Sequence, residues 1–197
     1  MTMIRLFTAL CKSVLEKLSD EAIFQEATDG YSYHKAQCPA CGTVGKLSPY
    51  GDYSRNLVSH DGEESIESSI SPRRFECGSC GRTHALLPDI LVPHSQYSLR
   101  FMLTALVAYF DRSKTIVALC AQFGIAVSTL YAWKHRLLEH KELLLGMVYS
   151  HNKPAHAFLR GLLASIHISE QLSYFFNRYA FSFLQNRPQP ATRSRSP

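Results

Sequence analysis

The chain has 197 residues, of which 46% are hydrophobic and 19% charged, a composition typical of a folded protein with a buried core and not of a disordered chain. No apolar run approaches the ~18–20 residues of a membrane span, and the large Leu10 before Cys11 argues against a signal peptide or lipid anchor. We therefore expect a cytoplasmic protein with no membrane partner. Six cysteines in that compartment suggest a metal site or free thiols before disulfides.

The net charge of +5 is distributed unevenly along the chain. Residues 1–30 carry a net −2 and residues 31–94 a net −1, whereas residues 95–197 carry +8. This concentration of positive charge predicts a polyanionic partner for the C-terminal half, with a solvated basic face as the plain alternative.

The elements expected in chain order define an α+β protein. Residues 1–30 are predicted to be helical, because apolar residues recur at helical spacing from Met3 to Leu18 and a short second helix can follow through Ala27. Residues 31–94 alternate and are rich in turn residues, which predicts strands at Leu47–Tyr50, Tyr53–Ser59 and Ser65–Phe75, with a hairpin tip at His60–Glu64.

Helical periodicity returns at Tyr97. We expect an all-α domain over residues 95–150, with helices from Tyr97, over Thr115–Phe123 and over Ser128–Leu145, bounded by Gly146. Further helices are expected over residues 151–186, the first starting at Asn152–Pro154, and the Pro/Ser/Arg-rich residues 187–197 should form a disordered basic tail.

Four of the six cysteines form two C-x-x-C-G motifs. Cys38 and Cys41 precede Gly42, and Cys77 and Cys80 precede Gly81. Each motif can place two thiolates on one tight turn, and two such turns brought together by a β-hairpin make the tetrahedral sulfur cage that zinc accepts. The sequence therefore predicts a small β-rich zinc ribbon with structural Zn²⁺ bound by all four cysteines, an iron–sulfur centre or a redox dithiol being the alternatives. His84 could replace a cysteine, but with four thiols available we interpret it as an ordinary strand residue.

The segment Ile116–His135 has the spacing of a helix-turn-helix. Gly124 lies where the turn needs a left-handed residue, Cys120 supplies a small side chain, and apolar residues including Trp133 can lock the two helices together. Its recognition helix, Ser128–His140, would enter the major groove of duplex DNA. Base edges would meet Ser128, Tyr131 and His135, and phosphates would meet Thr129, Lys134 and Arg136. Two residues depart from the pattern of a helix-turn-helix with tight sequence recognition. Ala126 occupies the usual capping position, and Ala132 lies where a long side chain often contacts a base.

The two motifs together resemble the N-terminal region of bacterial insertion-sequence transposases, and especially a short, uncharacterised zinc-ribbon/helix-turn-helix family related to them. The resemblance covers roughly residues 31–145 and implies recognition of DNA, such as the ends of a mobile element. The catalytic core of cut-and-paste transposases needs three metal-binding carboxylates, but after Asp111 this chain retains only Glu139, Glu142 and Glu170. We therefore expect no catalytic residues and no enzymatic activity.

The resulting prediction is a cytoplasmic, nucleoid-associated, zinc-stabilised protein that binds double-stranded DNA sequence-specifically. A homodimer is a further hypothesis, because a single helix-turn-helix seldom binds tightly alone. Two alternatives stay open: an adaptor that binds another protein instead of DNA, and an accessory or remnant subunit that supports a transposase acting in trans.

Overall fold

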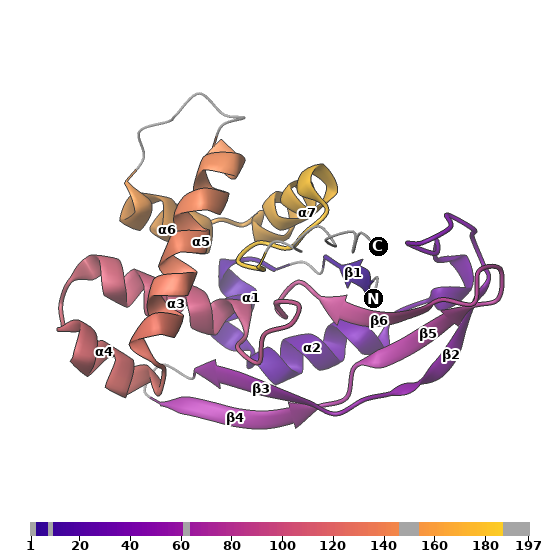
Figure 1. Ribbon diagram of the computed structural model, residues 1–197, viewed down its shortest axis with the longest axis horizontal. Helices are drawn as coiled ribbons and strands as arrows, with labels where there is room; N and C mark the ends of the chain where they lie inside the picture. Colours follow the sequence, from indigo (N-terminus) through magenta and orange to yellow (C-terminus); the bar gives the residue numbers. More distant parts are fainter. Residues whose placement is uncertain (1–2, 8–9, 61–63, 146–153, 187–197) are drawn as a thin grey trace, which may run out of the picture.

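The computed structural model describes residues 3–7, 10–60, 64–145 and 154–186. The expected hairpin tip at 61–63, Gly146, the helix start at Asn152–Lys153 and the tail 187–197 lie outside these ranges. Within them the fold is mixed α+β (Figure 1). The strands are β1 (Met3–Leu6), β2 (Leu47–Asp52), β3 (Arg55–His60), β4 (Ser65–Ile70), β5 (Arg73–Cys77) and β6 (Thr83–Pro88). The helices are α1 (Lys12–Lys17), α2 (Asp20–Asp29), a 3-10 turn (Tyr33–Lys35), α3 (Leu99–Asp111), α4 (Ile116–Phe123), α5 (Val127–Leu145), α6 (Ala155–Leu163) and α7 (Ile168–Tyr179).

The strands form a long, interrupted hairpin and two short additions to it. β2 and β3 run out along one side and β4 and β5 return along the other, so that β2 pairs with β5 and β3 pairs with β4 (Figure 1). The single strand expected over Ser65–Phe75 is therefore two strands, separated at Ser71–Pro72. Proline has no N–H to donate to a ladder, so it favours a break at this point. β6 adds to β5, and β1 completes the sheet in the order β1-β6-β5-β2.

The helix expected from Met3 is wrong at its start. Met3–Leu6 is a strand that pairs in parallel with β6, with Met3 opposite Ala85 and Leu6 opposite Pro88. Its hydrogen-bonding partner lies about eighty residues away, and tertiary pairing of this kind overrides the local helical spacing of apolar residues. The first helix begins only after Cys11.

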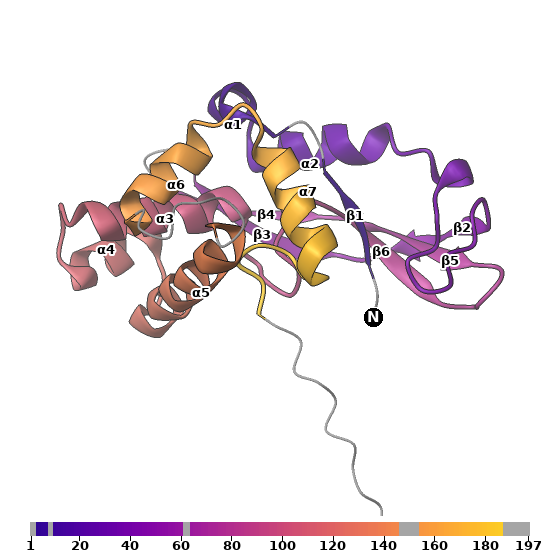
Figure 2. The same cartoon turned by 90° about the horizontal axis from the view of Figure 1, so that it is seen from above.

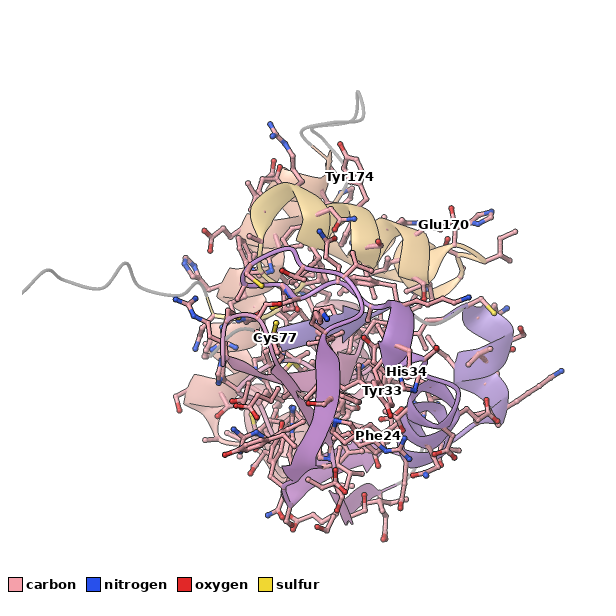
Figure 3. All side chains as sticks on the ribbon, turned by 90° about the vertical axis from the view of Figure 1, so that its right-hand side faces the viewer. Phe24, Tyr33, His34, Cys77, Glu170 and Tyr174 are labelled. Carbon is pink, nitrogen blue, oxygen red and sulfur yellow. The ribbon has the colours of Figure 1, made fainter. Side chains whose placement is uncertain are left out.

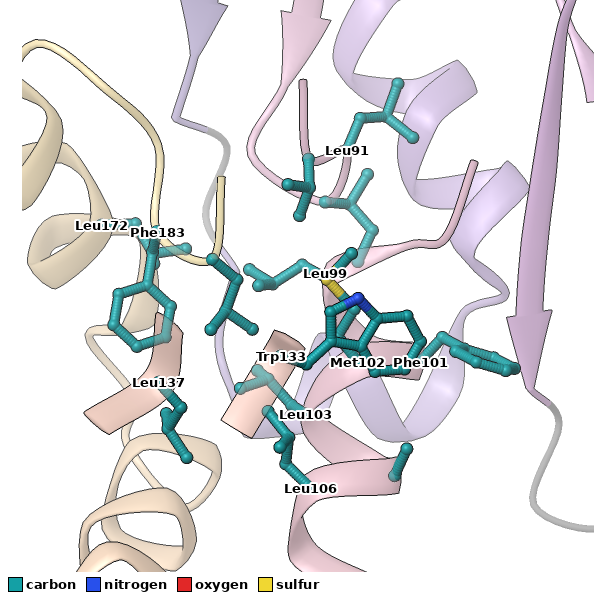
Figure 4. Packing of buried hydrophobic residues seen from close by; sticks show 14 of the residues in the cluster. Leu91, Leu99, Phe101, Met102, Leu103, Leu106, Trp133, Leu137, Leu172 and Phe183 are labelled. Carbon is teal, nitrogen blue, oxygen red and sulfur yellow. The ribbon is translucent and has the colours of Figure 1, made fainter. Parts of the chain in front are cut away.

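Two apolar clusters lie on opposite faces of β6. Ala85 and Leu87 belong to the large core, which contains residues of α2 to α7, β3 and β4. Leu86 faces the other way, into a small cluster beside the cysteines. The large core centres on α3, where Phe101 and Met102 are fully buried, and the Trp133 indole of α5 packs beside them (Figure 4).

The helices α4 and α5 are joined by a tight turn. Thr115 caps α4 through its hydroxyl, which accepts from the Ala118 N–H, and Gly124 ends it at φ 60°, ψ 33°. The Ile125 N–H then reaches back to the Cys120 carbonyl at 3.0 Å, as in a glycine-terminated helix. Within the described part of the chain no single helix is long and apolar enough to cross a membrane; α4 and α5 meet that test only when joined across their 97° bend.

Candidate functional site

The two C-x-x-C-G motifs fold into matching turns. In the first, the Gly42 N–H donates to the Cys38 carbonyl at 2.9 Å, and in the second the Gly81 N–H donates to the Cys77 carbonyl at 2.8 Å. Both glycines have positive φ, 76° and 65°, a conformation that residues with a Cβ rarely adopt. The first cysteine of each turn donates its own N–H to the carbonyl five residues ahead, at 2.9 and 3.0 Å. This repeated geometry explains why each motif needs its glycine.

The sheet brings the two turns together at one end of the molecule. Leu47 of β2 pairs with Cys77 of β5, and the Gly78 N–H donates to the Lys46 carbonyl at 2.9 Å. In Figure 3, which faces this end, Cys77 lies where β5 enters its turn. The predicted cluster is confirmed as a cluster: the sulfur atoms of Cys38, Cys41, Cys77 and Cys80 all lie within 4.8 Å of one another.

The sulfur separations fit a metal ion and not a disulfide. Cys38 Sγ and Cys80 Sγ are 3.8 Å apart, and Cys41 Sγ and Cys77 Sγ are 3.7 Å apart. A disulfide bond is about 2.05 Å long, whereas two thiolates on one tetrahedral zinc ion, each at about 2.3 Å, are separated by about 3.8 Å. All six cysteines of the chain have free thiols. The donor set therefore fits a tetrahedral, four-sulfur metal site.

The thiols differ in their surroundings. Cys38 and Cys77 are buried, whereas Cys41 and Cys80 lie nearer the surface. A hydrogen bond with Thr43 Oγ1 lowers the pKa of Cys41 to about 6. The backbone N–H of Arg82 lowers the pKa of Cys80, but burial and the three neighbouring sulfurs outweigh it and raise that pKa to about 11. Four thiolates this close repel one another, so a cation between them is needed to hold all four deprotonated.

His84 belongs to this cluster, contrary to its interpretation as an ordinary strand residue. It is buried on the same face of β6 as Leu86, and its Nε2 lies 3.3 Å from Cys38 Sγ. An imidazole N–H at this distance can donate to a metal-bound thiolate and fix its orientation. Its position four residues after Cys80 already indicated a possible role at the metal site. Which face of β6 the side chain occupies, and therefore that it contacts the sulfurs, is decided only by the tertiary structure.

The six residues predicted to contact DNA lie along the first turns of α5. Ser128, Tyr131 and His135 are exposed, and Thr129, Lys134 and Arg136 are half-buried. The exposed three recur at positions i, i+3 and i+7, so they share one face of the helix, whereas Leu130, Trp133 and Leu137 face the core.

Two of the basic side chains are held by aromatic or backbone groups. Lys134 Nζ lies 5.2 Å from the ring centre of Tyr109 and 5.5 Å from that of Tyr131, within reach of a cation–π attraction. Arg136 Nη1 points to the Leu184 carbonyl at 3.4 Å, and burial lowers its pKa. Lys134 is thus presented beside the exposed face, while Arg136 is partly engaged by the C-terminal segment.

The sequence around this turn contains positive charge without acidic residues. Residues 112–138 include Arg112, Lys114, Lys134 and Arg136 and no aspartate or glutamate. The next charged residues along α5 are Glu139, Lys141 and Glu142, so any polyanion would favour the N-terminal half of the helix.

Comparison with known proteins finds a similarity to a domain family. No curated protein and no solved structure matches the chain. Residues 38–133, from the first cysteine of the cluster to the core tryptophan of α5, are similar to a domain of unknown function, DUF6431.

Proposed function

We propose that the protein binds duplex DNA through α4 and α5, acting as a helix-turn-helix, and that structural zinc holds the four-cysteine ribbon that precedes it. The observation that carries this proposal is the exposed N-terminal half of α5, set in a stretch of residues 112–138 without a carboxylate. The resemblance to the DNA-recognition region of insertion-sequence transposases supports the same reading.

In a helix-turn-helix the second helix lies in the major groove and the first helix crosses the DNA backbone, and we assign these roles to α5 and α4. α5 enters the major groove, with Ser128, Tyr131 and His135 directed to base edges. Lys134 and the residues before α4, including Lys114, meet phosphates on either side. The usable part of α5, from Val127 to Leu138, is about 18 Å long, and Glu139 and Glu142 repel the phosphates beyond it.

The zinc ion would have a structural role. Four thiolates complete a tetrahedral coordination sphere and leave no position for water or substrate. Cys38, Cys41, Cys77 and Cys80 would hold it, and His84 would orient the Cys38 sulfur. The ion would therefore stabilise one end of the sheet and take part in no reaction.

A fluorescence anisotropy titration with a random-sequence duplex tests the DNA proposal. With four phosphate contacts, the binding constant should fall about 10²-fold between about 50 mM and 200 mM salt. Lys134→Ala should weaken binding to every sequence and make the log–log salt slope shallower by about one. Arg178→Ala, which removes an exposed charge on α7, is the matched control and should leave both unchanged.

The assignment of base contacts needs a second comparison. The double variant with Ser128→Ala and Tyr131→Ala should lose selectivity between sequences while keeping most of its affinity for random duplex. Absence of salt-dependent duplex binding by the wild type, even at low salt, would contradict the proposal and favour the protein-binding adaptor.

A further inference from the structure

Three adjoining hollows meet at the exposed side chain of His94. Their volumes are about 390, 330 and 1050 Å³, and His94 lines all three. Met3 is shared by the first and third, Pro93 by the first and second, and Gln185 by the second and third. The hollows therefore adjoin one another at His94, and their combined lining, which we call the trough, includes Arg136 of α5 at one end and Cys38 of the first cysteine turn at the other.

Each hollow combines arginine with an aromatic side chain. The first contains Arg55, Arg74 and Tyr53, the second Arg136, Tyr97 and Trp133, and the third Arg5, Phe7 and Phe176. Among the residues that the structure describes, no aspartate or glutamate lines any of the three. The rings of Tyr53, Tyr97, Phe7 and Phe176 are half-buried, so part of each stays accessible.

The arginines are held in place by the protein. Arg5 Nη1 donates to the Leu91 carbonyl at 2.9 Å, and Arg74 Nη2 donates to Thr83 Oγ1 at 2.9 Å. The Nε atoms of Arg5 and Arg74 are buried and have no hydrogen-bond partner among the described residues. Buried cationic groups without full pairing are costly, and an anion entering the trough would reduce that cost.

Acidic groups of the N-terminal half lie elsewhere. Asp89 acts electrostatically on Arg5, but its carboxylate accepts a hydrogen bond from Ser169 Oγ at 2.7 Å and lines none of the three hollows. Asp29 of α2 lies 3.6 Å from Arg73, the neighbour of Arg74 on β5. Residues 31–94 carry a net charge of −1. The trough nevertheless has a local surplus of positive charge, because arginines line it and aspartate and glutamate do not.

We propose that this trough binds a single-stranded segment of nucleic acid. A basic groove with interleaved aromatic rings is the arrangement that binds single strands, because phosphates meet the arginines while unpaired bases stack on the rings. Hollows of a few hundred cubic ångströms accept groups of small-molecule size. A duplex keeps its bases stacked on each other and cannot offer them to these rings. The proposal does not depend on duplex recognition by α5.

Neighbouring arginines on β5 provide a matched pair of variants. Arg74 lines the trough, whereas Arg73 is exposed and pairs with Asp29 on another side of the strand. We would titrate a fluorescein-labelled oligo(dT) of about 12 nucleotides, within the usual site size, at low salt. Arg74→Glu should weaken binding about tenfold, since it replaces a phosphate contact with repulsion. Arg73→Glu should change it less than about twofold.

A second variant protects the test against misfolding. Arg74→Glu also removes the hydrogen bond to Thr83, so its thermal unfolding must be compared with the wild type. His94 is exposed, and His94→Glu places a negative charge where the hollows meet; it should weaken oligo(dT) binding by a similar factor.

Three results would overturn the proposal. The first is absence of oligo(dT) binding by the wild type at low salt, and the second is an equal effect of Arg73→Glu and Arg74→Glu. The third is displacement of oligo(dT) by a blunt duplex as efficiently as by unlabelled single strand. The Ser128→Ala/Tyr131→Ala variant should retain oligo(dT) binding, so failure of the α5 proposal and failure of this one give different results.

Discussion

Replacing Cys77 by serine should unfold the cysteine end of the sheet and leave the helical half folded. Cys77 is fully buried, pairs with Leu47 across β2 and β5, and contributes one of the four sulfurs. Serine keeps the size of the side chain but is a poor ligand for a soft metal site. The change therefore removes metal affinity with little change in volume.

The magnitude follows from how little else stabilises this end. Besides its cysteines, the small cluster contains four buried apolar side chains, those of Ile4, Leu47, Phe75 and Leu86, and partly buried residues pack against it: Leu6, Tyr31, Tyr33, Ala36 and Ala40. At about 1.5–3 kcal/mol each, the four buried side chains contribute roughly 6–12 kcal/mol. A structural zinc ion contributes about 10–16 kcal/mol at neutral pH, as much as these side chains or more. The large core lies on the other face of β6 and does not include the cluster.

Hydrogen–deuterium exchange read by mass spectrometry distinguishes the two halves. In the zinc-loaded wild type the amides of Cys38, Gly42, Gly78 and Gly81, all hydrogen-bonded, should be protected. In Cys77→Ser, or after chelation, they should exchange rapidly while the amides of α3 stay protected. Cys11→Ser is the control, because Cys11 lies outside the cluster.

Metal content completes the assay. The wild type should bind one zinc ion per chain, Cys11→Ser should match it, and Cys77→Ser should bind far more weakly. Equal zinc affinity of Cys77→Ser and the wild type, or full amide protection of both turns after zinc is removed, would refute the reasoning.

Three further changes test individual contacts. His84→Ala should weaken zinc binding about 10–100-fold, measured by chelator competition, because Nε2 lies 3.3 Å from a cluster sulfur; unchanged affinity would deny it that role. Arg100→Ala should cost about 3–5 kcal/mol at neutral pH, since it leaves the buried Asp20 carboxylate, 2.6 Å from Arg100 Nη2, without its cation. Burial already raises the pKa of Asp20, so the variant should recover stability as falling pH protonates that group, and urea unfolding at two pH values should show the loss shrink. Gly124→Ala should lower the free energy of unfolding by about 1–2 kcal/mol and Tm by a few degrees, because φ is 60°. Open space surrounds the added Cβ, so a steric clash adds nothing to this loss. Gly30→Ala, at φ −83°, should be nearly neutral.

Local patterns identified most of the elements. The helices α3, α4 and α5 and the strands of the long hairpin lie close to their predicted ranges, because the apolar spacing of each segment is set by the face that it buries. The two C-x-x-C-G motifs and Gly124 carry their own turn geometry, which is why the tight turns could be placed in advance.

Long-range pairing escaped the same reasoning. β1 was predicted to be helical because no residue near Met3 indicates that this segment pairs as a strand with Ala85 of β6. His84 looked ordinary because the face that it occupies depends on how β6 lies between two clusters. Net charge by segment does not show which charges meet: Arg5, Arg55, Arg74 and Arg136 come from different parts of the chain and line the three hollows, and no aspartate or glutamate among the described residues lines them. Figure 2 shows from above the elements that carry these arginines, β1, β3, β5 and α5.

By itself the sequence determined the chemistry that this protein carries: four thiols in two glycine-closed turns, and a basic helix after a left-handed glycine. Only the tertiary structure decided what those groups face. Turn geometry depends on a few adjacent residues, whereas the partner of a strand, the neighbour of a sulfur and the lining of a trough depend on segments far apart in the chain that meet only when the core is packed.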